Sequence, residues 1–287
     1  MLTLNPSRLE RLRELVASHA GAFRRRDQAR WAALYLLGLQ EAEGRRNIES
    51  VARALSQSGV VGPLDLAQDL AQGLGHFLSQ SPWDESTLWR RFTERLAGAP
   101  GEAEGLFVLE EFPFVKQGRH SVGVHRQFSR TLGRKANCQL AIGLYHVHHT
   151  AELIGLRLYL PRAWRRDEER LEAAGVPVAQ RESLDRLSIG RELLETARQA
   201  GLTSRRLAAG QGWHWGQEGD EGESAWIAHG YTLAPLEGRE ADEVQRTRER
   251  LLELGLGHFE GRSWRGFHHH VCLVALAAWA ERLTSLR

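Results

Sequence analysis

Cysteines and long apolar runs are scarce in this chain of 287 residues. The two cysteines, Cys138 and Cys272, cannot build a disulfide framework, and their spacing fits no metal-binding motif. The longest apolar run, Val271 to Ala280, is half of the roughly 20 residues that a membrane-spanning helix needs. No apolar segment follows a charged start, as it would in a signal peptide. We therefore expect a soluble protein of the reducing cytoplasm with no membrane partner.

Neither sign of charge is in large excess. The chain has 38 Lys and Arg against 36 Asp and Glu, a net charge of +2. Phosphate binding needs clustered cations rather than an overall surplus, so this balance adds little support for a polyanion partner. With 42% hydrophobic and 26% charged residues the composition is that of a globular protein. The length allows one large core, or one core plus a helical subdomain.

The first 97 residues show helical periodicity. In the predicted helix 22–43, for example, Trp31, Leu34, Tyr35 and Leu39 form one apolar face. We expect an all-helical N-terminal domain over 1–97, ended by a linker rich in Gly, Ala and Glu at 98–105. The other helices of this domain are predicted near 9–16, 48–55, 64–79 and 86–96.

The remainder of the chain, 106–287, alternates strands with helices. Strands are predicted at 106–112, 120–127, 138–147, 153–160, 205–209 and 224–233. Helices are predicted at 188–200, 239–254 and 266–286, and a helix, or a helix followed by a loop, at 161–174. Antiparallel strands followed by alternating helix and strand predict an α/β fold whose mixed sheet is flanked by helices.

The segment from Leu106 to Gln139 carries the residues most suggestive of chemistry. A buried strand ends in two adjacent carboxylates, Glu110 and Glu111, and a basic, glycine-punctuated segment follows. Carboxylates at the end of a core strand, beside a cationic hairpin, are what a metal-dependent phosphoryl-transfer site needs. For a single pair of glutamates, a solvated strand end next to a basic loop is the simpler interpretation.

Three sequence blocks resemble bacterial insertion-sequence transposases of the DDE superfamily. They are KQGRHSVGV at 116–124, HFLSQSPWD at 76–84 and ELGLGHFEGRSWRG at 253–266. The resemblance implies an RNase H-like core, in which three carboxylates hold two divalent cations, and a helical N-terminal segment that contacts DNA. The chain is a truncated relative, because it has room for only one strand and a loop at 216–244, where the transposases carry a long, mostly β insertion.

The three acidic positions that the resemblance implies are eroded. The first is occupied by Glu110 or Glu111, each one methylene longer than the aspartate of the family, which displaces an octahedral Mg²⁺. A glycine, Gly210 or Gly212, stands at the second. Counting back from the last block places the third at Val244, and the neighbouring Glu243 is rotated from it by about 100°. We expect no metal, no cofactor and no two-metal strand transfer.

Two functions fit these residues. In the first, the chain is a repurposed enzyme acting on a small substrate, with Glu110 or Glu111 as the general base. Lys116, Arg119 or His120 would hold an anionic leaving group. Trp213, His214 and Trp215 would form the walls of the pocket, although packing is the alternative explanation for this Trp-His-Trp segment.

In the second function the chain binds duplex DNA without cutting it. This hypothesis leaves the two glutamates unexplained, because carboxylates that no metal neutralises repel DNA. A third hypothesis, a His/Glu metal site, lacks convincing ligand spacing. A partner subunit that covers a face exposed by the missing insertion is also expected. The cations predicted to contact phosphates are Arg24, Arg25, Arg45, Arg46, Arg134, Lys135, Arg262 and Arg265.

Overall fold

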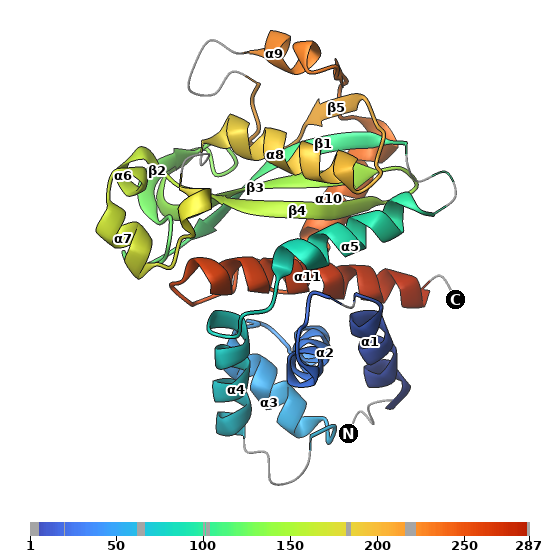
Figure 1. Ribbon diagram of the computed structural model, residues 1–287, viewed down its shortest axis with the longest axis vertical. Helices are drawn as coiled ribbons and strands as arrows, with labels where there is room; N and C mark the ends of the chain where they lie inside the picture. Colours follow the sequence, from blue (N-terminus) through green and yellow to red (C-terminus); the bar gives the residue numbers. More distant parts are fainter. Residues whose placement is uncertain are drawn as a thin grey trace. The chain divides into compact units, whose positions relative to one another are not determined.

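The computed structural model describes residues 6–19, 21–61, 67–99, 101, 104–181, 185–215 and 222–285. The chain divides into two compact units (Figure 1). The first comprises residues 1–88, 249–261 and 265–287, and the second comprises residues 89–248 and 262–264. The division after residue 88 falls inside a helix, and the C-terminal helix belongs to the first unit. The domain boundary expected at 98–105 therefore stays a prediction.

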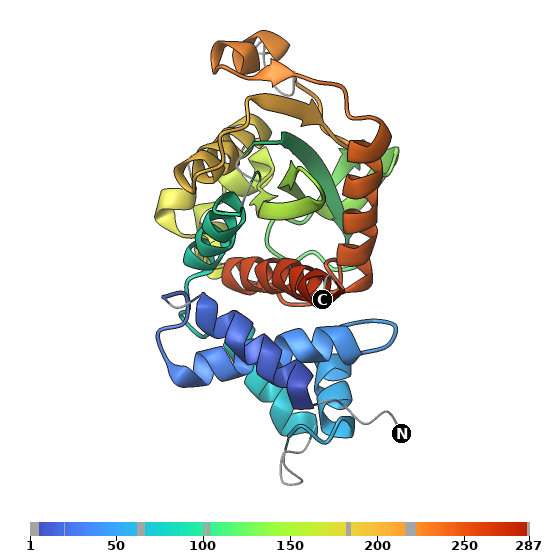
Figure 2. The ribbon, with the colours of Figure 1, turned by 90° about the vertical axis from the view of Figure 1, so that its right-hand side faces the viewer.

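The first unit is helical, as its periodicity predicted. Its N-terminal helices pack through apolar side chains that are fully buried, among them Leu36, Leu55 and Phe77. The long C-terminal helix belongs to the same unit and lies beside α1 and α2 in both views (Figures 1 and 2). The helices of this unit are α1 (Pro6–Ser18), α2 (Arg26–Glu41), α3 (Ile48–Gln57), α4 (Ala67–Ser79) and α11 (Trp264–Ser285).

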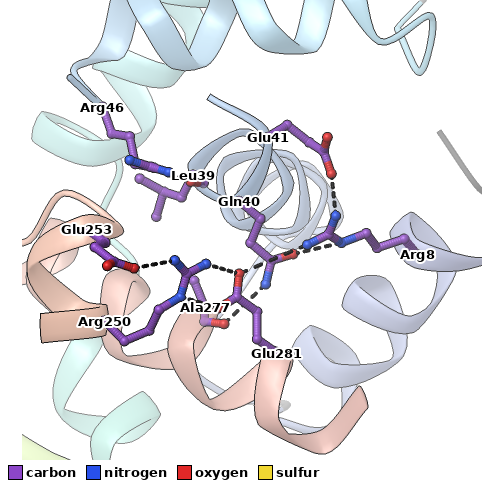
Figure 3. A network of polar contacts seen from close by, with 9 residues as sticks. All are labelled: Arg8, Leu39, Gln40, Glu41, Arg46, Arg250, Glu253, Ala277 and Glu281. Carbon is purple, nitrogen blue, oxygen red and sulfur yellow. Dashed lines mark hydrogen bonds and ion pairs between the residues drawn. The ribbon is translucent and has the colours of Figure 1, made fainter. Parts of the chain in front are cut away.

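A polar network joins α1, α2 and α11 to residues 249–253, which also belong to the first unit (Figure 3). Arg250, on the last turns of α10 (Gly238–Glu253), binds both carboxylate oxygens of Glu281 at 2.7 Å and one oxygen of Glu253 at 2.8 Å. Arg8 of α1 binds Glu41 of α2 and lies 4.0 Å from Glu281. These arginines are neutralised inside the unit, so the network serves packing rather than ligand binding.

The second unit is built on a mixed sheet. Its strand order is β2-β3-β1-β5-β6, and β4 pairs with β3 on the same edge as β2, farther along the strand. β3 pairs antiparallel with β1, β2 and β4, whereas β1–β5 and β5–β6 are parallel. This is the RNase H-like arrangement that the resemblance implied. The strands are β1 (Leu106–Val115), β2 (His125–Ser129), β3 (Arg134–Val147), β4 (Ala151–Tyr159), β5 (Arg206–Ala209) and β6 (Thr232–Leu233).

Helices cover both faces of this sheet. In both views α8 (Arg186–Gln199) lies on one face and α10 on the other (Figures 1 and 2). Gly190 of α8 packs against Leu109 of β1, and Thr247 of α10 donates a hydrogen bond to the carbonyl of Ala151 in β4. The remaining elements are α5 (Glu85–Ala97), α6 (Arg162–Arg165), α7 (Glu168–Ala173), a short 3-10 helix (Val178–Gln180) and α9 (Glu223–Ala228).

Three predicted elements differ from the structure. The strand predicted at 224–233 is wrong: the segment forms α9, a turn at Gly230 (φ 82°) and the short β6. Its alternation was too short to separate strand from helix, and its buried side chains, Trp226 and Tyr231, are five residues apart. The strand predicted at 120–127 begins only at His125, and the helix predicted at 161–174 is split into α6 and α7. None of the helices among the described residues is long and apolar enough to cross a bilayer.

Candidate functional site

Glu110 and Glu111 lie on opposite faces of the sheet. Adjacent residues of a strand point to opposite sides, and the partners of the two carboxylates confirm it. Glu110 meets Arg248 of α10, and Glu111 meets Arg186 of α8. Glu110 is only 3% exposed and Glu111 only 1%. The two acids therefore do not converge on one ligand.

Both carboxylate oxygens of Glu110 are bound. Oε2 accepts a hydrogen bond from Nη1 of Arg248 at 2.7 Å, and Oε1 accepts one from the backbone N–H of Gln211 at 3.0 Å. The Arg248 guanidinium also lies 4.4 Å from the centre of the Phe112 ring. Burial raises the pKa of Glu110, and the charge of Arg248 and the Gln211 N–H offset part of that shift.

Glu111 is held on the other face of the sheet. Its Oε1 accepts a hydrogen bond from the Ser129 hydroxyl at 2.8 Å, and its Oε2 lies 3.3 Å from Nη2 of Arg186. The backbone is fixed as well, because the N–H of Glu111 donates to the carbonyl of Gln211, and its carbonyl accepts from the Thr131 hydroxyl. The carboxylate therefore links β1 to α8 and to the β2–β3 turn.

The second acidic position has no room for a side chain. β5 runs parallel to β1, and Gly210 follows its last residue directly beside Glu110. A Cβ on Gly210 would stand 2.3 Å from Cγ of Glu110, and one on Gly212 would stand 2.2 Å from the Thr131 hydroxyl. Gly212 also has φ +74°, which disfavours other residues. Whichever glycine matches the family aspartate, an acid cannot be accommodated there without rearrangement.

The third acidic position is apolar, and a cation stands close to it. Val244 is 2% exposed in the face of α10 that covers the sheet, while Glu243 forms an ion pair with Arg246, which is exposed. Arg248 lies four residues after Val244, one turn along the same helix face. The sequence interpretation missed Arg248 and Arg186, although counting one turn beyond Val244 would have found the first.

These residues do not fit a pair of divalent cations. Mg²⁺ needs several open oxygen ligands in octahedral geometry, whereas the oxygens of Glu110 are already bound and Val244 offers none. Within the described residues, no three His, Cys, Asp or Glu side chains are grouped so that they could hold a metal ion. This includes His146, His148 and His149. Glu218, Asp220 and Glu221, the acids that follow the second position in the sequence, lie outside the described residues.

Comparison with known families shows the family of this chain. Residues 20–214 match the model of the family described as DDE superfamily endonuclease. The chain belongs to the DDE superfamily of endonucleases. The region of this DDE-superfamily chain that matches includes β1 and Gly210 but ends before α10. No curated protein and no solved structure matches the chain.

The groups predicted to hold an anionic leaving group lie away from the carboxylates. β1 continues in extended conformation to Val115, so the backbone of Lys116 is about 20 Å from that of Glu110 at 3.3 Å per residue. Arg119 and His120 are exposed in the following loop. The structure therefore does not bring the predicted base and these cations to one pocket.

The Trp-His-Trp segment forms an aromatic cluster. Trp213 and Trp215 make edge-to-face contacts with each other and with Trp226 of α9, with ring centres 5.8 to 6.5 Å apart. Trp213 is buried beside Gly190 of α8, whereas His214 between the two tryptophans is exposed. Packing explains this segment, as the alternative interpretation held.

Several of the arginines predicted to contact DNA have partners inside the protein. Arg45 forms an ion pair with Glu260 at 2.7 Å, and Arg25 forms one with Asp27 at 3.4 Å. Arg46 donates to the carbonyls of Leu39 and Gly44, and Arg265 donates to that of Gln80. Arg24 and Arg262 are exposed. Four of the eight predicted cations are therefore committed to local structure.

The cations of the β2–β3 hairpin, among them Arg134 and Lys135 of that set, differ from these paired arginines. No Asp or Glu occurs between Glu111 and Glu152, a stretch that holds six Lys and Arg. Four of them lie on the hairpin and are exposed. Among the described residues none of these four forms an ion pair. The hairpin cations are Arg126, Arg130, Arg134 and Lys135.

Proposed function

We propose that this DDE-superfamily chain binds DNA through the β2–β3 hairpin and does not cut it by two-metal chemistry. The observation that carries the proposal is the row of hairpin cations, exposed and without carboxylate partners in the described part of the chain. Exposed cations that bind phosphates release the counterions of DNA, which is the main source of sequence-independent affinity. Arg134 and Lys135, predicted from the sequence, both belong to this hairpin, on its opposite faces, since Arg134 pairs with Ser129 and Lys135 with Phe128.

The buried ion pairs of β1 support the proposal. Uncompensated carboxylates near a phosphate backbone would repel DNA, but Glu110 is paired with Arg248 and Glu111 with Arg186. Both glutamates are also almost fully buried. They present no net negative charge to a ligand, so the pair no longer argues against DNA binding.

Loss of two-metal chemistry follows from the same residues. Strand transfer in the superfamily needs carboxylates that hold two cations on either side of the reacting phosphate. Here Arg248, Gly210 and Val244 stand where those cations and their ligands belong. A guanidinium supplies one fixed charge and cannot lower the pKa of a water ligand as a metal does.

A gel shift of the full chain on duplex DNA at several salt concentrations tests the proposal. With four phosphate contacts we expect log K to fall with log salt at a slope of about −4, and the DNA to stay intact with Mg²⁺ or Mn²⁺ present. A slope near zero would refute DNA binding through these cations. Metal-dependent cleavage by the pure protein, absent after Glu110→Gln, would refute the loss of catalysis.

The repurposed acid–base enzyme remains a second candidate. It is favoured by the raised pKa of Glu110 and by the Trp213 Nε1 and Tyr145 hydroxyl, buried donors without partners among the described residues. The burial of both glutamates weighs against it. Its test is a thermal-shift screen of small anionic compounds. A compound that stabilises the wild type but not Glu110→Gln or Glu111→Gln would support it.

A further inference from the structure

The exposed face of the β2–β3 hairpin carries an aromatic ring among cations. Phe128 pairs directly with Lys135, and Arg126 pairs with Asn137. Directly paired residues of neighbouring strands point to the same face, so these four side chains share one side of the hairpin. Phe128 is 51% exposed there. The charged residues of this face, Arg126 and Lys135, are both positive.

The exposure of Phe128 is imposed by the register of the hairpin. Ser129, Ala136 and Cys138 on the opposite face are buried, and the Ser129 hydroxyl is bound to Glu111. A slip of one residue would bury Phe128 and expose Ser129. Core contacts therefore hold the ring in solvent, and no rearrangement of the hairpin can hide it at low cost.

A single exposed apolar side chain is ordinary on a protein surface; its charged surroundings make this one distinctive. Surfaces that bind exposed nucleotides combine cations, which follow the phosphates, with aromatic rings on which bases stack. Arg126 and Lys135 lie beside Phe128 on its own face, and Arg130 follows it by two residues. The stretch holds no acid that would repel a phosphate.

We infer that Phe128 stacks on an exposed base of bound DNA while Arg126 and Lys135 contact the adjoining phosphates. This inference rests on the proposed DNA binding and assigns to the hairpin a ligand class, a nucleotide whose base is unpaired. A fully paired duplex offers its bases only at its ends or in its grooves. The hairpin is therefore expected to prefer DNA with a single-stranded overhang.

The test uses the full chain and two fluorescent probes, a blunt duplex and the same duplex with an overhang that contains 2-aminopurine. Wild-type protein should bind the overhang probe more tightly and quench its 2-aminopurine fluorescence. Phe128→Ala should weaken binding of the overhang probe about tenfold or more, abolish the quenching and leave the salt slope unchanged. Phe128→Tyr should retain the tight binding of the overhang probe and the quenching. Val115→Ala is the matched control, since Val115 is 56% exposed but pairs with Cys138 of the opposite face.

The outcomes separate this inference from the proposed function. If wild-type protein binds neither probe with a steep salt dependence, the proposed function fails and the stacking role falls with it. If wild-type protein binds both probes but Phe128→Ala behaves like Val115→Ala, DNA binding stands and the role of Phe128 is refuted. Circular dichroism of each variant verifies that the hairpin change leaves the fold intact.

Discussion

Arg248 and Glu110 lie 138 positions apart in the chain and form an ion pair of 2.7 Å in which both side chains are less than a tenth exposed. α10 brings the arginine to the face of β1 on which the Glu110 side chain lies. A positive charge is thus kept beside the first carboxylate, but it belongs to the protein.

Breaking the pair should strongly destabilise the protein. Arg248→Ala leaves the Glu110 carboxylate buried without its counter-charge, and such changes cost about 3–5 kcal/mol. We expect the free energy of unfolding in urea to fall by that amount. Arg246→Ala, on the same helix but exposed, should change it by less than about 0.5 kcal/mol.

The double variant Glu110→Gln with Arg248→Met should recover much of the loss, because it removes both charges and keeps similar volumes. If Arg248→Ala alone is as stable as the wild type, the ion pair does not hold β1 to α10. That result would also remove the argument that Arg248 excludes a metal.

An acid at position 210 should not rebuild a metal site. Gly210→Asp forces its Cβ into Glu110, and overpacking of this kind costs about 1–3 kcal/mol. Mg²⁺ should leave the melting temperature of the variant unchanged, since a ligand raises stability only if it binds the folded state. Gly118→Asp is the control, because a Cβ there meets nothing within 4 Å. A rise of the melting temperature with Mg²⁺ in Gly210→Asp alone would contradict this prediction.

Acid should destabilise the helical unit through His269. Burial lowers the pKa of His269 to about 4 from 6.5, so the folded state binds fewer protons than the unfolded state in this window. Stability is then complete above about pH 6.5 and is lost as the pH falls toward 4. Between about pH 7 and about pH 5 the loss from this one histidine is about 2 kcal/mol.

Urea unfolding at these two pH values measures the effect in the wild type and in His269→Gln. The variant should lose about 2 kcal/mol less on acidification, whereas His214→Gln, which removes an exposed histidine, should behave as the wild type. An unchanged pH dependence in His269→Gln would show that His269 does not cause this loss of stability. His146, whose pKa burial also lowers to about 4, should contribute in the same direction.

DNA binding should depend on the hairpin and not on the paired arginines. Lys135→Gln and Arg134→Gln should each reduce the salt slope by about 1, because each removes one phosphate contact. Arg45→Gln, whose guanidinium is bound to Glu260, should leave the slope unchanged. The reverse pattern, with the slope sensitive to Arg45 and insensitive to Lys135, would move the DNA-binding surface to the helical unit.

Sequence alone predicted most of the elements in their order and most of their limits. The buried run Leu106–Leu109 predicted β1, and apolar periodicity predicted α2, α10 and α11 within a few residues, because these patterns are local. The quoted blocks pointed to the superfamily. The position of Val244 could likewise be counted back from the last block, without any coordinates.

Only the tertiary structure decided what surrounds the two glutamates. No local pattern links Glu110 to Arg248 or Glu111 to Arg186, since each pair is formed by packing a distant helix on one face of the sheet. Strand pairing, equally invisible in the sequence, turned Phe128 and Lys135 to the same exposed face. The sequence named the acids and the cations, and long-range packing determined which were neutralised and which remained open to a ligand.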